Sequence, residues 1–326
     1  MSGQEAGNER ILIAGPASAP LSGSLRVPGD KSISHRAVML ASLADGVTEI
    51  EGFLPGEDNL ATCAMFEAMG VAIRWKDESR TRLAVEGRGL FGLEEPERPL
   101  DAGNSGTCAR LMTGVLSGQS FFSVLIGDAS LHRRPMRRVV EPMRRMGAHV
   151  DGRAGGDKLP LAIRGGKLKA IRHAPEVASA QVKSCVLLAG LYAEGTTEVI
   201  EPRPTRDHTE RMLPRFGQPV EVGENGAIRL SPAGRLAAPD DTLRIPADPS
   251  SACFFAVAAS IVPDSRIRLE QVGINPRRDG WRRILATMGA QLDVMPLEEG
   301  GLEPVADIEV RSGRLANLSV DPADVP

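Results

Sequence analysis

Aromatic side chains are scarce in this sequence and make up only 3% of its residues. Hydrophobic residues of all kinds nevertheless reach 42%, so buried cores must be built from aliphatic side chains and methionine. Single hydrophobic cores stop growing at about 250–300 residues. A chain of 326 residues is therefore expected to form two domains with aliphatic cores.

Paired cysteines, excess charge and long apolar runs are also missing. The four cysteines stand singly and form no C-x-x-C pair, which argues against a zinc site and favours buried free thiols in a reducing compartment. A net charge of −3 disfavours a general nucleic-acid or membrane-surface binder. The longest strongly apolar run, 252–262, is too short to span a bilayer, and the first ten residues lack the pattern of a signal peptide. We expect a cytoplasmic protein that binds neither nucleic acid nor membranes.

An internal repeat runs through the sequence. Four helical apolar patterns end on a glycine, and these glycines stand about seventy residues apart, at Gly70, Gly147, Gly217 and Gly289. Short alternating stretches follow, which predicts a helix, a glycine C-cap and then a strand. An apolar helix also precedes a strand that closes on glutamate in three places, and an aspartate then opens the next helix: Asp58, Asp207 and Asp279.

Each repeat therefore reads as strand, helix, strand, helix and strand. Such a unit cannot bury its faces alone, so the units must stack. The sequence predicts an α/β fold built from these units.

The segment 28–36, PGDKSISHR, carries the sharpest chemical signal. A predicted strand at 25–27 runs into a Pro-Gly turn and then a helix whose first turn holds Lys31 and Ser32. Arg36 follows Ser32 by four residues and shares its helical face. Cations, a hydroxyl and free amides at a helix N-terminus suit an anion. A P-loop is excluded because it needs glycine where Leu25 and Asp30 stand. An ordinary capped helix with solvated charges is the alternative.

Three further segments offer polar groups at predicted helix starts. Gly106, within NSGT at 104–107, would let a ligand approach the backbone, although a plain cap with a turn glycine fits equally. Arg134 precedes Pro135, which is predicted at the first position of a helix. That helix should bury Met136, Val139, Val140, Met143 and Met146 and leave its other arginines solvated. Ser179 and Gln181 are neutral hydrogen-bonding residues ahead of the apolar run 186–191.

These segments resemble the signatures of the 5-enolpyruvylshikimate-3-phosphate (EPSP) synthase family. The resemblance covers 28–36, 100–111, 127–136, 178–184, 205–210 and 248–252, and the Ser-Ala-Gln and TRDHTE forms are similar to its class II branch. It implies an α/β, two-globe enolpyruvyltransferase fold of repeated βαβαββ units, with about four of six units present. It also implies a complete three-unit globe at 29–245, on the shikimate 3-phosphate side, and a partial second globe from 1–28 plus 246–326.

The resemblance also implies an activity. Such an enzyme moves the enolpyruvyl group of phosphoenolpyruvate to the 5-hydroxyl of shikimate 3-phosphate and releases phosphate, as a monomer without metal or cofactor. Glyphosate occupies the phosphoenolpyruvate pocket in this family. The implied shikimate 3-phosphate ligands are Lys31, Ser32, Arg36, Ser179, Ala180, Gln181 and Arg206. The implied phosphoenolpyruvate ligands are Lys31, Gly106, Arg134 and Gln181.

The family's catalytic aspartate has no counterpart before Pro326. Its Ile-Asp-Glu-x-Pro segment would fall just beyond that residue, and Asp321 and Asp324 lack the required neighbours. Lys31 is then the one catalytic candidate, and we expect residues 1–326 alone to be inactive. The alternatives are a UDP-N-acetylglucosamine enolpyruvyltransferase and an inactive anion-binding fragment. The Ser-Ile-Ser-His-Arg and Ser-Ala-Gln segments favour the shikimate branch.

Overall fold

Four sheets with the same strand order organise the chain. The computed structural model describes residues 15–297 and 303–320, and Asp321 and Asp324 lie outside them. In each sheet a strand pairs in parallel with a central strand, which pairs antiparallel with the second strand of a hairpin. The first sheet contains β15 (Leu236–Ala237), β16 (Leu243–Arg244), β2 (Ala44–Glu51), β4 (Arg82–Arg88) and β3 (Ala72–Trp75).

The other three sheets repeat this plan. The second contains β5 (Leu100–Asp101), β6 (Phe122–Ile126), β8 (Lys158–Arg164) and β7 (His149–Gly152). The third contains β10 (Arg172–His173), β12 (Thr197–Ile200), β14 (Ala227–Leu230) and β13 (Glu221–Val222). The fourth contains β1 (Ser22–Leu25), β17 (Arg266–Gly273), β19 (Val305–Arg311) and β18 (Gln291–Pro296). A short pair, β9 (Leu168–Lys169) and β11 (Ala193–Glu194), stands apart from them.

Two principal helices accompany each sheet. They are α1 (Lys31–Ser42) and α2 (Glu57–Glu67), α3 (Gly106–Ser117) and α4 (Arg137–Met146), α6 (Ala180–Gly190) and α7 (His208–Met212), and α8 (Pro249–Ile261) and α9 (Gly280–Thr287). The remaining short pieces are α5 (Arg153–Gly156), η1 (Leu131–Arg133) and η2 (Leu213–Phe216). The longest helix here, α8, has 13 residues, and none of those described could cross a membrane.

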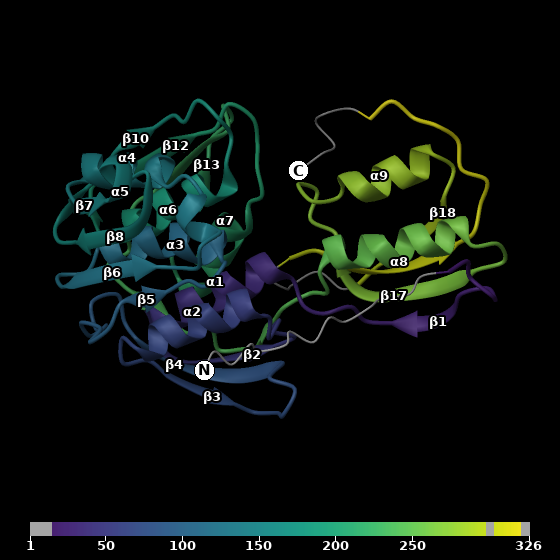
Figure 1. Cartoon of the computed structure of the whole chain (residues 1–326), viewed down its shortest axis with the longest axis horizontal. Coiled ribbons are helices and arrows are strands. Elements are labelled where there is room, and N and C mark those ends of the chain that lie inside the picture. The colour runs from purple at the N-terminus through teal and green to yellow at the C-terminus, as the bar shows by residue number, and fades with distance from the viewer. Residues whose placement is uncertain (1–14, 298–302, 321–326) are drawn as a thin grey trace, which may run out of the picture.

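The described residues form two bodies, each with its own apolar core (Figure 1). The core of the first body draws on residues between Ile33 and Ile245, and α1, α3 and α6 are buried along most of their length. The core of the second body combines Val27 with residues from Ala247 to Val310. Most of these side chains are aliphatic, as the composition predicts.

The chain passes between the bodies twice. β1 pairs with β17 in the second body, whereas β16 pairs with β2 in the first. The two crossing segments, 26–30 and 245–248, lie against each other: the Asp30 amide donates to the Pro246 carbonyl and the Asp248 amide to the Pro28 carbonyl, both at 2.9 Å. These pairings support the division into 29–245 and 1–28 plus 246–326, whose boundaries stay a prediction.

The glycine that ends each repeat adopts the conformation expected of a helix C-cap. Gly70, Gly147, Gly217 and Gly289 have φ of 87°, 109°, 78° and 99°. Side chains with a Cβ rarely adopt such values, which explains why glycine recurs there.

Two expected element boundaries are wrong. β1 ends at Leu25 rather than spanning 25–27, because Arg26 and Val27 already belong to a crossing segment. α4 begins at Arg137, so Pro135 precedes the helix instead of occupying its first position. The buried stripe of α4 is nevertheless confirmed.

The aspartates at the helix starts do not act as side-chain caps. Asp207 and Asp279 stand at the N-caps of α7 and α9, but their carboxylates bind Arg211 and Arg282 instead. Asp58 lies inside the first turn of α2 and pairs with Lys31. A guanidinium or ammonium offers a carboxylate a stronger partner than a neutral amide does.

Candidate functional site

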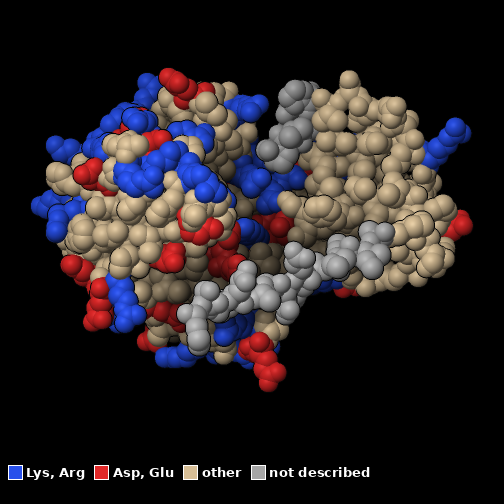
Figure 2. All heavy atoms as spheres, in the orientation of Figure 1, with Lys and Arg blue, Asp and Glu red and all other residues tan. Residues whose placement is uncertain are grey.

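Helix α1 begins at the crossing between the bodies. Asp30 is its N-cap, and one carboxylate oxygen accepts the Ile33 amide at 3.0 Å. This cap leaves Lys31 exposed and Ser32 half-buried at the helix start. Lys31 forms an ion pair with Asp58 of α2. Basic side chains gather in the hollow between the bodies, with acidic side chains beside them (Figure 2).

Arg36 lies beneath this surface and is only 4% exposed. Its Nε donates to Thr209 Oγ1 at 2.7 Å, Nη1 to the Ser32 carbonyl at 2.9 Å and Nη2 to Ser184 Oγ at 2.6 Å. Burial lowers the pKa of Arg36 to about 10, so it remains a cation at neutral pH. The guanidinium thus ties α1 to α6 and α7, and its role as a ligand stays a prediction.

Gln181 connects the start of α6 to the start of α3. Its Oε1 accepts from Arg110 Nη1 at 2.7 Å, and its Nε2 donates to Thr107 Oγ1 at 3.0 Å. A methyl group added at Gly106 would lie 2.8 Å from Arg110 Nη1 and 3.2 Å from Arg134 Nη1. Three predicted phosphoenolpyruvate ligands, Gly106, Arg134 and Gln181, therefore share one cluster.

The sequence reasoning missed Arg110. Its guanidinium reaches Gln181, and its Nη2 also donates to the Pro135 carbonyl at 3.1 Å. The signal was a lone arginine one turn after Gly106 in an otherwise apolar helix, where a buried residue would be expected. Arg134 donates to Asn104, which in turn donates to Asp128 at 2.6 Å.

The remaining predicted ligands lie at the starts of α6 and α7. Ser179 is the N-cap of α6, and Ala180 is its first residue. Arg206 is half-buried just before α7. Burial and Arg278 lower the pKa of Arg206, while Asp30 and Asp248 oppose that shift. Across 15–297 and 303–320 we find no hydrogen bond or ion pair to Arg206, so its charge is available to an anionic ligand.

Comparisons with known proteins identify the family. The EPSP synthase (3-phosphoshikimate 1-carboxyvinyltransferase) profile matches residues 16–324. A 3-phosphoshikimate 1-carboxyvinyltransferase from Pelobacter propionicus is 52% identical over 94% of this chain and 70% of its own length. One from Methylococcus capsulatus is 53% identical over 97% of this chain and 71% of its own. The chain belongs to the EPSP synthase family.

The fold agrees with this assignment. A solved EPSP synthase from Acinetobacter baumannii superimposes with a TM-score of 0.86 at 46% identity, covering 94% of this chain and 68% of that one. The predicted fold class is confirmed. The chain spans about 70% of the length of the two relatives named above.

His35 stands inside the family signature but points away from the ligand surface. It is fully buried, with Nδ1 2.7 Å from Thr62 Oγ1 and Nε2 3.5 Å from Ser105 Oγ. Burial, reinforced by Arg36, lowers the pKa of His35 to about 3. The neutral ring thus links α1 to α2 and to the N-cap of α3, and its role is structural.

Asp207, His208 and Glu303 form the one cluster in the described ranges whose spacing would suit a metal ion. His208 Nδ1 lies 2.5 Å from Glu303 Oε1, and the Asn275 amide donates to Asp207 and to Glu303, both at 2.7 Å. These contacts pair most of the polar atoms of the cluster, although His208 Nε2 is buried without a hydrogen-bond partner among the described residues. In this EPSP synthase family member they form a polar link between the bodies rather than an open set of ligands.

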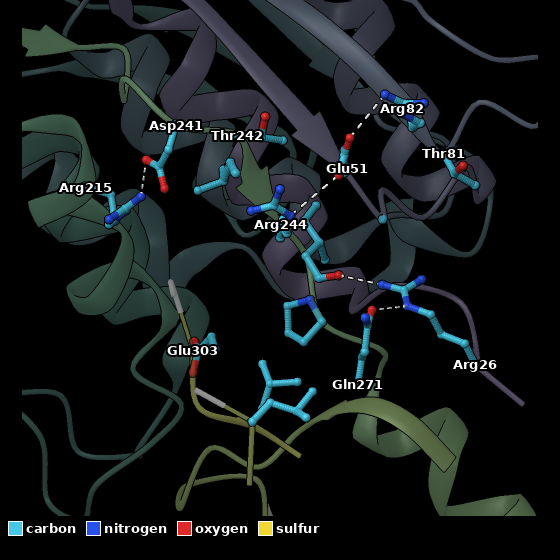
Figure 3. A pocket seen from close by; sticks show the side chains of 16 residues that line it. Arg26, Glu51, Thr81, Arg82, Arg215, Asp241, Thr242, Arg244, Gln271 and Glu303 are labelled. Carbon is cyan, nitrogen blue, oxygen red and sulfur yellow. Dashed lines mark hydrogen bonds and ion pairs between the residues drawn. The ribbon is translucent and has the colours of Figure 1, made fainter. Parts of the chain in front are cut away.

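A cavity of about 760 Å³ opens beside the crossing segments (Figure 3). Its cations are occupied: Arg26 donates to Gln271 and to the Ile245 carbonyl, both at 2.9 Å, while Arg82 and Arg244 pair with Glu51. No predicted ligand lines this cavity. It is therefore separate from the candidate site.

Proposed function

We propose that this chain binds phosphoenolpyruvate and shikimate 3-phosphate for the transfer of the enolpyruvyl group from the first to the second. The relatives are named for 3-phosphoshikimate, which favours this acceptor over UDP-N-acetylglucosamine. The observation that carries the proposal is the meeting of Arg110, Arg134 and Gln181 around Gly106, close to where three helices begin. Both substrates are strongly anionic, so cations around an open backbone suit them.

The proposal assigns the residues to two groups. Shikimate 3-phosphate would contact Lys31, Ser32, Arg36, Ser179, Ala180, Gln181 and Arg206. Phosphoenolpyruvate would contact Lys31, Gly106, Arg134 and Gln181. Arg110 would hold the Gln181 amide in place for both, and Lys31 would share or leave its pairing with Asp58.

The chemistry is an addition followed by an elimination. The substrate 5-hydroxyl gives up its proton to a base and attacks C2 of phosphoenolpyruvate while C3 takes up a proton from an acid, which gives a tetrahedral intermediate. The bond between C2 and the phosphate oxygen then breaks as C3 loses a proton. Lys31 is the acid–base candidate in this chain, and the clustered cations would stabilise the charge on phosphate as it leaves. That residues 1–326 alone give no turnover stays a prediction, as do the class II assignment, the monomeric state and the cytoplasmic location.

Calorimetry on residues 1–326 with shikimate 3-phosphate tests the proposal. A charge-assisted contact contributes about 1.5–3 kcal/mol, so Arg206→Ala should weaken binding about ten- to hundredfold. Arg203→Ala is the matched control, since Arg203 is an exposed arginine in the same loop. Binding of UDP-N-acetylglucosamine in preference to shikimate 3-phosphate, or an equal loss in both variants, would contradict the proposal.

A further inference from the structure

One buried arginine joins the starts of two helices that belong to different bodies. Arg278, which precedes α9, is 6% exposed. Its Nη1 donates to Asp30 Oδ2 at 2.7 Å, and its Nη2 donates to Asp248 Oδ1 at 3.1 Å and to Ser250 Oγ at 2.6 Å. Asp30 caps α1 and Asp248 caps α8. A single guanidinium therefore holds both N-caps.

The same point is where the chain crosses between the bodies. Gly29 bridges to Ala247, and Ala247 also bridges to Val272 of β17. A rotation of the second body relative to the first would therefore disturb the contact between Arg278 and Asp30. Lys31 and Ser32 follow Asp30 directly, so a shift of Asp30 moves two proposed ligands.

The charges give Arg278 a second effect. Burial raises the pKa of Asp30, but Arg278, His208 and the Ile33 amide lower it more, so Asp30 stays ionised. Burial and then Asp30 raise the pKa of Asp248, and Arg278 opposes both. Both carboxylates also interact with the charge of Arg206. Without Arg278, they would draw Arg206 toward themselves and away from a ligand.

We propose that Arg278 is a positioning residue for the substrate site, which holds the start of α1 against the second body and keeps Arg206 available to an anionic substrate. This inference rests on the proposed function, because shikimate 3-phosphate is the ligand that Arg206 would meet. A positioning role for Arg278 differs from a purely structural role in one testable respect. Neutralising the carboxylate of Asp248 should restore part of the shikimate 3-phosphate binding that is lost without Arg278.

Shikimate 3-phosphate binding to residues 1–326 tests the inference. We expect Arg278→Gln to weaken binding about ten- to hundredfold, since small misplacements of binding groups have effects of that size. Arg278→Lys should weaken it less, because it keeps the charge but cannot bridge three acceptors. Adding Asp248→Asn to Arg278→Gln should recover part of the loss. Arg282→Gln is the control. It removes an arginine of α9 that pairs with Asp279, and it should bind shikimate 3-phosphate like the parent chain.

Hydrogen exchange at the Ile33 amide gives a readout that needs no ligand. Arg278→Gln should speed this exchange, because Asp30 then loses the partner that fixes its carboxylate under that amide. If the parent chain does not bind shikimate 3-phosphate, the proposed function fails and exchange alone decides the inference. Parent-like binding or unchanged exchange in Arg278→Gln would overturn it. Should Arg278→Gln not fold, Arg278→Lys is judged by the same two measurements, and parent-like values overturn the inference.

Discussion

An added methyl group at Gly106 should change the affinity for a ligand directly, because this residue lies in the proposed phosphoenolpyruvate site. A methyl group there would crowd the guanidinium ends of Arg110 and Arg134, which are flexible and can move. We therefore expect Gly106→Ala to fold, and to displace groups that face phosphoenolpyruvate. Overpacking costs about 1–3 kcal/mol, which corresponds to roughly ten- to hundredfold in affinity.

Glyphosate is longer than phosphoenolpyruvate, so its affinity should fall further. Competition binding in the presence of shikimate 3-phosphate measures both ligands. Gly15→Ala is the control, because a methyl group at that exposed glycine meets no atom within 4 Å. Equal losses for the two ligands would show that Gly106 does not shape this pocket.

His35 should make the folded chain less stable in acid. Its pKa is about 3 when folded, below the ordinary value of 6.5. Between these values the unfolded chain binds a proton that the folded chain does not, so stability falls as pH drops from about 6.5 toward 3. The slope from this one group approaches about 1.4 kcal/mol per pH unit. Urea unfolding from pH 7 to pH 4 measures it.

The variant His35→Gln removes this titration. The slope of unfolding free energy against pH should therefore fall by up to about 1.4 kcal/mol per pH unit, which is the contribution of one proton. His149→Gln, which changes an exposed histidine, should leave the slope as it is. An unchanged slope in His35→Gln would mean that the acid sensitivity comes from other groups.

The candidate site could be predicted from sequence only where a residue stands in a recognisable local pattern. Gly106 and Gln181 stand at predicted helix starts and Arg134 stands beside a proline, and the family resemblance then implied their roles as ligands. Arg110 was missed because its one local signal, a lone arginine in an otherwise apolar helix, does not say which partner the cation reaches. Arg278 was missed for a related reason: its partners Asp30 and Asp248 are far from it in sequence, and only folding brings them together.

At the scale of elements, the repeat was predictable from periodicity, whereas only the family resemblance implied that the N-terminal strand joins the second body. Glycine C-caps and apolar helix stripes have strong periodic signals, which is why helices were expected close to α1, α3, α4 and α6, although the start of α4 was placed two residues too early. β16 has only two residues and joins β2, almost two hundred positions earlier, while β1 joins β17. Such short strands are too short to show the alternation of apolar and polar residues that predicts a strand. Their partners are set by how the chain crosses between the bodies.

Helix α8 presents an apolar face that other parts of the described chain leave uncovered. Phe254 is 78% exposed and Ile261 is 61% exposed. Exposed apolar patches promote association. We expect Phe254→Gln to reduce self-association at high protein concentration, which light scattering measures, with little change in folding.

Phe91→Gln is the matched control for this face. Phe91 is 70% exposed in the first body and lies against Tyr192. If both variants reduce association equally, general surface hydrophobicity rather than the α8 face is responsible.

At the scale of the whole molecule, the two bodies have unequal cores. The core of the first body contains large side chains such as Phe53, Phe66 and Phe216, while about half of that of the second is alanine. Stabilisation by burial grows with the apolar area removed from water, at about 25 cal/mol per Å². The second body is therefore expected to be the less stable, and protease should cut within 246–326 before it cuts within 29–245.

The two tryptophans allow each body to be followed separately. Trp75 packs on Phe53 with ring centroids 5.7 Å apart in the first body, and Trp281 packs against the core of the second. In Trp75→Phe the fluorescence reports the second body, and in Trp281→Phe it reports the first. We expect the Trp281 signal to change at a lower urea concentration than the Trp75 signal, because polar contacts such as Arg278 to Asp30 join the bodies without merging their cores. Transitions that coincide in the two variants would mean that the crossing couples the bodies into one cooperative unit.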